Sequence, residues 1–171
     1  MIKILALTLF SFFISSKTSA SSAICLYYNS IVDTDELANK EPKMYSVAWA
    51  KEQINKYPDL ESRTEVQLHG NSLTFRGATE IINYLLEKMP QLKKLDLSHN
   101  PLTKGSTCEE YFPIFCDSLK KLLQRPQFQE IKLSGTDVHL EPWLSAIQEI
   151  DKQIGSHKVN YFPFTETYRI P

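Results

Sequence analysis

The side chains with the greatest potential for chemistry in this 171-residue sequence are four histidines, three cysteines and scattered carboxylates. His69 and His99 lie a few positions after Glu65 and Asp96, and imidazole with carboxylate can bind a divalent metal. Neither a His-Glu-x-x-His motif nor a Cys-x-x-Cys pair occurs, so a metal site would lack ligands at standard spacing. We therefore expect solvated histidines and no bound metal.

The cysteines form no recognisable catalytic or disulfide framework. Cys116 lies in an apolar and aromatic segment, which favours a buried core thiol. Cys108 is eight residues away, about 12 Å along a helix, and this is too far for a disulfide bond. A bridge that involves Cys25 stays open, and at least one thiol is left over. The neighbouring Glu109 and Glu110 are typical of the first turn of a helix, where the helix dipole favours carboxylates.

Sequence motifs of the common enzyme classes are absent. There is no Gly-x-Ser-x-Gly, P-loop or Gly-x-Gly-x-x-Gly motif, and five glycines make a phosphate-binding loop improbable. The composition, 42% apolar and 23% charged, is that of an ordinary globular protein, and a net charge of −1 provides no basic surface for nucleic acid. We expect no catalytic residue, no cofactor and no nucleic-acid partner.

Residues 1–23 have the layout of a secretory signal peptide. Lys3 precedes an uncharged apolar run, Ile4–Ser16, that is shorter than the roughly 20 residues of a membrane span. Small residues end at Ala20 and Ala23, and we expect cleavage after one of them. Cleavage after Ala23 removes two lysines and no acidic residue, so the net charge falls from −1 to −3. The segment predicts a secreted or periplasmic protein without an integral membrane segment.

Three later segments share the pattern apolar-x-apolar-x-x-Asn/Thr-x-apolar, at spacings of 29 and 36 residues. They are Val66–Leu73, Leu95–Leu102 and Ile131–Val138. The second extends back to Leu92, which completes Leu-x-x-Leu-x-Leu-x-x-Asn-x-Leu, and Val159–Phe164 is a degraded fourth copy. Self-similarity at such a period predicts a repeat architecture.

The pattern resembles the leucine-rich repeat, in its ribonuclease-inhibitor-like subtype, over about residues 61–164. The resemblance implies an α/β fold, a short right-handed solenoid with parallel strands on the concave face and helices on the convex face. It also implies that Asn71 and Asn100 bind backbone groups where the chain leaves each strand, with Thr136 at that position in the third copy. The longer spacing before the third copy predicts about seven inserted residues, around 104–108.

Helical periodicity fills the intervals between the copies, independently of any family. Apolar residues recur at helical spacing in 44–57, whose stripe includes Ala48, and in 75–89, 111–123 and 143–154. Parallel strands joined by helical crossovers explain this alternation.

The ends of the repeat array are expected to carry caps. A short strand is expected within Ile24–Ile31, which makes 24–60 an N-terminal cap, 61–158 the repeats and 159–171 a C-terminal cap and tail. An aromatic binding tail is the alternative for the last segment.

Side chains alternate along a strand, so the neighbours of the inward apolar residues are expected to line the concave face. Alignment of the copies gives three rows: Glu65, Lys94 and Glu130; Gln67, Asp96 and Lys132; His69, Ser98 and Ser134. Lys158, Asn160 and Phe162 continue them. Charges alternate along the first row at a strand spacing of about 4.8 Å, where opposite charges attract modestly. The rows are interpreted as a self-neutralising ladder or as a docking surface for a protein, and the two are compatible.

The function expected from this sequence is that of an exported interaction module, which binds a protein partner of unknown identity through its concave face. This step rests on analogy at the level of the fold, because leucine-rich repeats bind many unrelated molecules. The alternatives are a structural envelope protein and a secreted enzyme with a site outside the known motifs.

Overall fold

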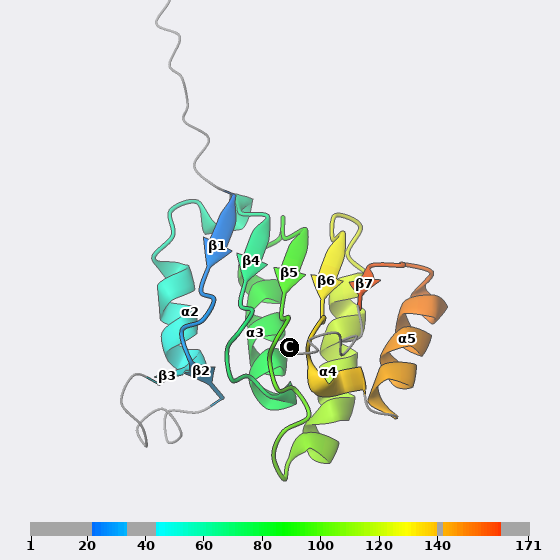
Figure 1. Ribbon diagram of the computed structural model, residues 1–171. Coiled ribbons are helices and arrows are strands. Elements are labelled where there is room, and N and C mark those ends of the chain that lie inside the picture. Colours follow the sequence, from blue (N-terminus) through cyan, green and yellow to red (C-terminus); the bar gives the residue numbers. More distant parts are fainter. Residues whose placement is uncertain (1–21, 34–43, 140–141, 162–171) are drawn as a thin grey trace, which may run out of the picture.

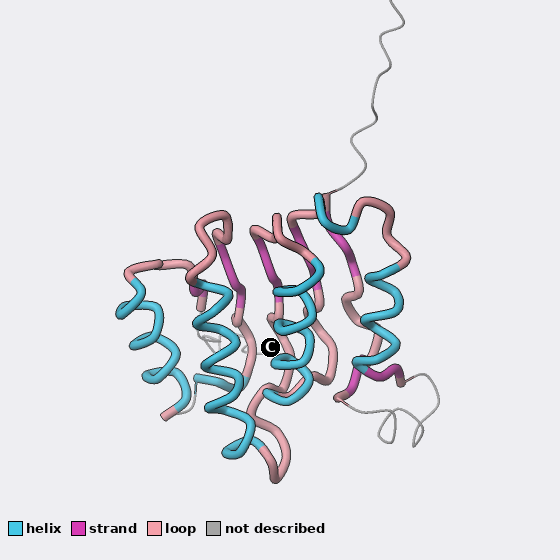
Figure 2. Tube along the Cα trace, turned by 180° about the vertical axis from the view of Figure 1, so that it is seen from behind, coloured by secondary structure: helices cyan, strands magenta, loops and turns pink. Residues whose placement is uncertain are grey.

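The computed structural model describes residues 22–33, 44–139 and 142–161. Five short parallel strands form one sheet in the order β1-β4-β5-β6-β7, and the helices cover one face of it (Figure 1). Figure 2, which views the molecule from behind, shows the helices as a layer in front of the strands. The structure is therefore a two-layer α/β arrangement in which each strand of the main sheet pairs with the next one in chain order.

The predicted helices and parallel strands are confirmed. The main sheet consists of β1 (Ala23–Cys25), β4 (Glu65–Gln67), β5 (Lys94–Asp96), β6 (Glu130–Lys132) and β7 (Val159–Asn160), and β2 (Ile31–Val32) pairs with β3 (Tyr45–Ser46) in a second sheet. The helices are α2 (Val47–Asn55), α3 (Phe75–Lys88), α4 (Cys108–Leu123) and α5 (Trp143–Ile154), with 3₁₀ turns at Leu60–Ser62 and Asp137–His139.

Local side-chain and backbone signals set the helix ends. At the start of α3, Thr74 Oγ1 accepts a hydrogen bond from the Arg76 N–H at 3.3 Å, and at the start of α2, Ser46 Oγ accepts one from the Trp49 N–H at 3.3 Å. Helix α5 ends at Gly155, whose φ of 65° lies in the left-handed region that glycine adopts without strain. N-cap residues and the terminal glycine thus fix where the helices that support the sheet begin and end.

One continuous core fills the space between the two layers. The strand residues expected to point inward are all 1% exposed or less: Val66, Leu68, Leu95, Leu97, Ile131 and Leu133. On the helical side, Phe75 of α3 is fully buried against the rings of Phe112, Phe115 and Trp143, at centroid distances of 4.9 to 5.7 Å. Three consecutive helices therefore share one aromatic cluster.

The N-terminal segment differs from its prediction. Ile24–Ile31 is not one strand, because β1 ends at Cys25 and a turn through Tyr28, with φ 54°, separates it from β2. Strand β1 pairs with β4, with Ile24 opposite Val66. This segment therefore joins the main sheet as its first strand.

Two helices bury less apolar surface than the periodicity predicts. In α2 the buried residues are Val47, Ala50 and Ile54, and the expectation that Ala48 faces the core is wrong. Ala48 lies about 100° around the helix from the fully buried Val47, which turns it to solvent. In α5 only Ile147 is buried, because this last helix has a described helical neighbour, α4, on one side only.

Parts of the predicted organisation lie outside the described residues, namely 1–21 of the signal peptide and 162–171 of the C-terminal tail. Within the described part of the chain, none of the helices has the length and apolar character that a membrane crossing requires.

Candidate interaction surface

The face of the sheet opposite the helices carries the predicted rows of side chains. The strand register pairs Glu65 with Lys94 and Lys94 with Glu130, which confirms the first row. The second row is confirmed in the same way and runs through Gln67, Asp96, Lys132 and Asn160. The ladder continues beyond the strands, since the Gly70 N–H donates to Ser98 O and the His99 N–H donates to Ser134 O, each at 2.9 Å. Phe162 lies outside the described residues.

The members of the rows differ in how much surface they offer. Lys94 and Lys132 are exposed, whereas Glu65, Gln67, His69, Asp96, Glu130 and Ser134 are half-buried. Ser98 is 7% exposed, so the expectation that it lines the open surface is wrong. Its short side chain lies beside the longer His69 in the third row and reaches little solvent.

The alternating charges of the first two rows do not form ion pairs. Among the described residues, Lys94 and Lys132 have no acidic partner within 4 Å. Glu65 instead accepts a hydrogen bond from Gln67 Nε2 at 2.8 Å, and Glu130 accepts one from an amide on β7 at 2.8 Å. The exposed ammonium groups of Lys94 and Lys132 thus make no direct ion pair with the described carboxylates beside them.

A buried asparagine closes the turn after β4. Asn71 Nδ2 donates to Leu26 O at 2.9 Å and Leu68 O at 2.8 Å, while its Oδ1 accepts from the N–H groups of Asn29 and Ile31 at 3.0 and 3.1 Å. One amide therefore satisfies four backbone groups that belong to two neighbouring chain segments. A buried backbone group without a partner is costly, which explains why an amide occupies this position.

The same arrangement repeats after β5 and is reduced after β6. Asn100 Nδ2 donates to the carbonyls at the ends of β4 and β5, including Leu97 O at 2.9 Å, and its Oδ1 accepts from the Leu73 N–H at 3.2 Å. Thr136 Oγ1 donates to Leu133 O at 2.6 Å. These are the backbone contacts that the resemblance assigned to Asn71, Asn100 and Thr136.

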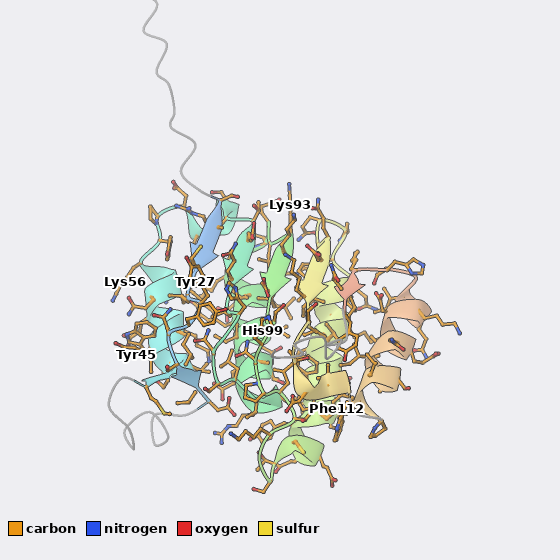
Figure 3. The ribbon with its side chains drawn as sticks, in the orientation of Figure 1. Tyr27, Tyr45, Lys56, Lys93, His99 and Phe112 are labelled. Atoms are coloured by element: carbon orange, nitrogen blue, oxygen red, sulfur yellow. The ribbon has the colours of Figure 1, made fainter. Side chains whose placement is uncertain are left out.

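Rings alternate with glycines along the ends of the strands. Tyr28, Gly70, His99 and Gly135 occupy equivalent positions, with φ between 54° and 68°. A Cβ at Gly70 would lie 2.3 Å from Tyr28 Cε1, and a Cβ at Gly135 would lie 2.3 Å from His99 Nδ1. Each ring thus occupies the space beside the glycine of the next strand. Figure 3 shows Tyr27 near the end of β1 and His99 beyond the end of β5.

An aromatic patch, made of Tyr27, Tyr28 and His69, occupies the end of this surface nearest β1. The Tyr27 and His69 rings stack with centroids 4.8 Å apart and planes 7° apart, and the Tyr28 ring meets His69 edge-on at 5.2 Å. Tyr27 and Tyr28 are nevertheless 45% and 69% exposed. On the other side, His69 Nδ1 faces Asp96 Oδ2 at 3.8 Å. Sequence reasoning assigned Tyr27 and Tyr28 to a strand and missed this patch.

The described residues provide little basis for metal or thiol chemistry. Nowhere among them do three potential metal ligands gather. Cys25, Cys108 and Cys116 are all free thiols. Cys116 is half-buried instead of fully buried, and burial, with a smaller contribution from Asp117, raises the pKa of its thiol to about 12. Such a thiol stays protonated and is a poor nucleophile.

A groove of about 630 Å³ runs between the C-terminal ends of α4 and α5. It is lined by Lys120, Gln124, Gln153 and Ser156, among others. Lys158, which also borders it, donates to Leu123 O and Arg125 O at 2.8 and 3.1 Å, so its ammonium group binds the end of α4. In this polar lining the Ser156 hydroxyl donates to the Asp151 carboxylate, which also accepts a hydrogen bond from the Lys158 N–H at 3.2 Å.

Another copy of the sequence pattern precedes those that the sequence analysis found. Ile24, Leu26, Asn29 and Ile31 fit apolar-x-apolar-x-x-Asn-x-apolar, and the pairing of Ile24 with Val66 places this copy in register with the next. The signal was present in the residues, but 42 positions separate Ile24 from Val66, and the longer interval hid it.

Comparisons of the sequence with known families and with curated proteins add no relative. No model of a known protein family matches the sequence, and no curated protein matches it.

Proposed function

We propose that the chain is a short leucine-rich-repeat-type solenoid that acts as an interaction module and binds a protein partner through the open face of its sheet. The proposal rests on the face of the main sheet that no described helix covers. All described helices lie on the opposite side, and the face presents exposed lysines, half-buried carboxylates and exposed tyrosines in fixed rows. A rigid, preformed surface of this kind loses little conformational entropy on binding.

The repeat character of the proposal is supported by the register and by the turns. Strands of the main sheet pair in chain order, equivalent residues lie opposite each other, and buried Asn71, Asn100 and Thr136 follow successive strands. Stacked units of this type bury a continuous core between neighbours and leave one extended surface open.

We propose further that the protein is exported and that the signal peptide is cleaved after Ala20. Ala23 belongs to β1 and pairs with Glu65, so cleavage after Ala23 would remove one of the three residues of this strand. Mass spectrometry of the exported protein gives a mature chain that begins at Ser21 if the proposal holds. A chain that begins at Ile24 contradicts this choice of site.

The partner surface is tested by photo-cross-linking. A photoreactive amino acid at position 132, on the open face, is expected to cross-link a partner protein in extracts of the source cell and its surroundings. The same amino acid at Lys121, on exposed α4, is the control and should not.

A matched pair of variants then tests the chemistry of the face. Asp96→Ala with Lys94→Ala, made in the chain that carries the photoreactive amino acid at position 132, is expected to keep the circular dichroism spectrum and to weaken the cross-link at least tenfold. Asp117→Ala with Lys121→Ala removes the same charges from the helical side and should leave the cross-link intact. Equal cross-linking in both variants, or cross-linking only from position 121, contradicts the proposed surface.

A further inference from the structure

We propose that the aromatic patch and Asp96 together bind an arginine side chain of the protein partner. This inference rests on the proposed function and names the group on the partner that the surface recognises. It depends on three observations: exposed ring faces, a carboxylate oxygen with unused hydrogen-bonding capacity, and the imidazole that connects them.

The first observation is the set of exposed rings. Tyr27, Tyr28 and His69 touch one another, yet the two tyrosines keep 45% and 69% of their surface exposed. Their positions are fixed, because Tyr27 stacks on His69 and the Tyr28 ring lies beside Gly70. Rigid, exposed tyrosine rings attract cations through their faces, and arginine more often than lysine, because a planar guanidinium can also stack.

The second observation is the state of Asp96. Its Oδ1 accepts a hydrogen bond from the Ser98 N–H at 2.9 Å, which fixes the carboxylate. Its Oδ2 lies 3.8 Å from His69 Nδ1, which is beyond hydrogen-bonding distance, and His69 Nδ1 is a buried atom without a hydrogen-bond partner among the described residues. Oδ2 therefore keeps lone pairs for a donor from outside, and a guanidinium N–H forms a strong, charge-assisted bond to such an oxygen.

The connection through His69 makes these features one site. The imidazole touches both tyrosine rings on one side and faces the carboxylate on the other. The guanidinium plane is then expected to lie against the Tyr28 ring, the more exposed of the two, while an N–H group reaches Asp96, because His69 covers one face of Tyr27. Lys132, the register neighbour of Asp96, is on β6, away from the tyrosines that follow β1, so the nearest cation on that strand does not occupy the patch.

Charge and shape together select the occupant. A carboxylate on the partner would meet Asp96 with the same charge, and a purely apolar group would leave this carboxylate without a partner. A lysine supplies charge but not a plane, and a citrulline supplies the plane without the charge. Arginine is the side chain that satisfies both features.

The test uses N-acetyl-arginine amide as the probe, with the lysine and citrulline analogues as controls. Nuclear magnetic resonance of the mature protein is expected to show saturable shifts of the side-chain signals of Tyr27, Tyr28 and His69 with arginine. We expect at least tenfold weaker binding for citrulline, and weaker binding for lysine. Asp96→Asn keeps the acceptor for the Ser98 N–H and should weaken arginine binding at least tenfold, which corresponds to about 1.4 kcal/mol. Asp117→Asn on α4 is the matched control and should have no effect.

Several outcomes overturn the inference. They are arginine shifts confined to another surface, equal binding of citrulline, or unchanged binding by Asp96→Asn. A partner that cross-links at position 132 and tolerates both Asp96→Asn and Tyr28→Ala also overturns it, while the proposed function stands. Specific arginine binding at the patch without any cross-linked partner supports the site and contradicts the proposed function, so the two failures are distinguishable.

Discussion

The substitution Asn100→Ala tests whether the buried asparagines stabilise the fold. Asn100 is 1% exposed, and its removal leaves the Leu97 carbonyl and the Leu73 N–H without the partner that each has now. The Leu68 carbonyl loses one bond but keeps its bond from Asn71. Two buried backbone groups without partners cost about 1–3 kcal/mol each, so we expect a loss of about 4 kcal/mol. That is a large part of the 5–15 kcal/mol by which domains are usually stable.

The assay is urea unfolding followed by circular dichroism and tryptophan fluorescence. For a chain of this length a loss of 4 kcal/mol also lowers Tm by about 8–16 °C. Asn100→Thr copies the hydroxyl of Thr136 and should lose less, whereas Asn55→Ala, at an exposed position in α2, should cost under about 1 kcal/mol. If Asn100→Ala costs no more than Asn55→Ala, the backbone groups find other partners and the reasoning is refuted.

Three further predictions concern the core, a turn and a thiol. Phe75→Ala removes a fully buried ring and should cost about 4 kcal/mol in urea unfolding, and a cost under about 1 kcal/mol would contradict its central place in the core. Gly135→Ala places a Cβ 2.3 Å from His99 Nδ1, at a φ of 67°, and should cost about 2 kcal/mol in thermal unfolding. In the double variant, His99→Gly should relieve part of this cost. If the losses of the two single variants simply add, the contact is contradicted. Because the pKa of its thiol is raised to about 12, Cys116 should react with iodoacetamide at pH 8 at least tenfold more slowly than the exposed Cys25. Its rate should rise towards pH 11. Peptide mass spectrometry that finds Cys116 modified first would refute this expectation.

Much of the sheet was predictable because its signals are local and repeated. Alternation of apolar and polar residues fixes which side chains of a strand face the core, and a slip by one residue would bury charges. The repeated positions of Val66, Leu95 and Ile131 therefore defined both the strands and their register, which the structure confirms.

Features that depend on neighbouring chain segments could not be predicted from the sequence. The burial of Ser98 occurs where its carbonyl accepts a hydrogen bond from the Gly70 N–H of the neighbouring segment, and the stacking of Tyr27 on His69 joins residues 42 positions apart. The hydrogen bonds of the carboxylates in the rows depend on side-chain orientation, as Glu65 and Gln67 show within one strand. The αL turn at Tyr28 is equally hidden, because a tyrosine with positive φ has no sequence signature.

Pairing of the strands in chain order has a mechanical consequence. When the two ends of the molecule are pulled apart, an outer strand–helix unit detaches from a single neighbour, and the remaining units keep their own contacts. Helix α5 buries only Ile147, so the unit that contains it should detach first. Successive units begin 42, 29, 36 and 28 residues apart, and at about 3.5 Å per extended residue each release lengthens the chain by roughly 100–150 Å. The protein should thus extend under tension in discrete steps.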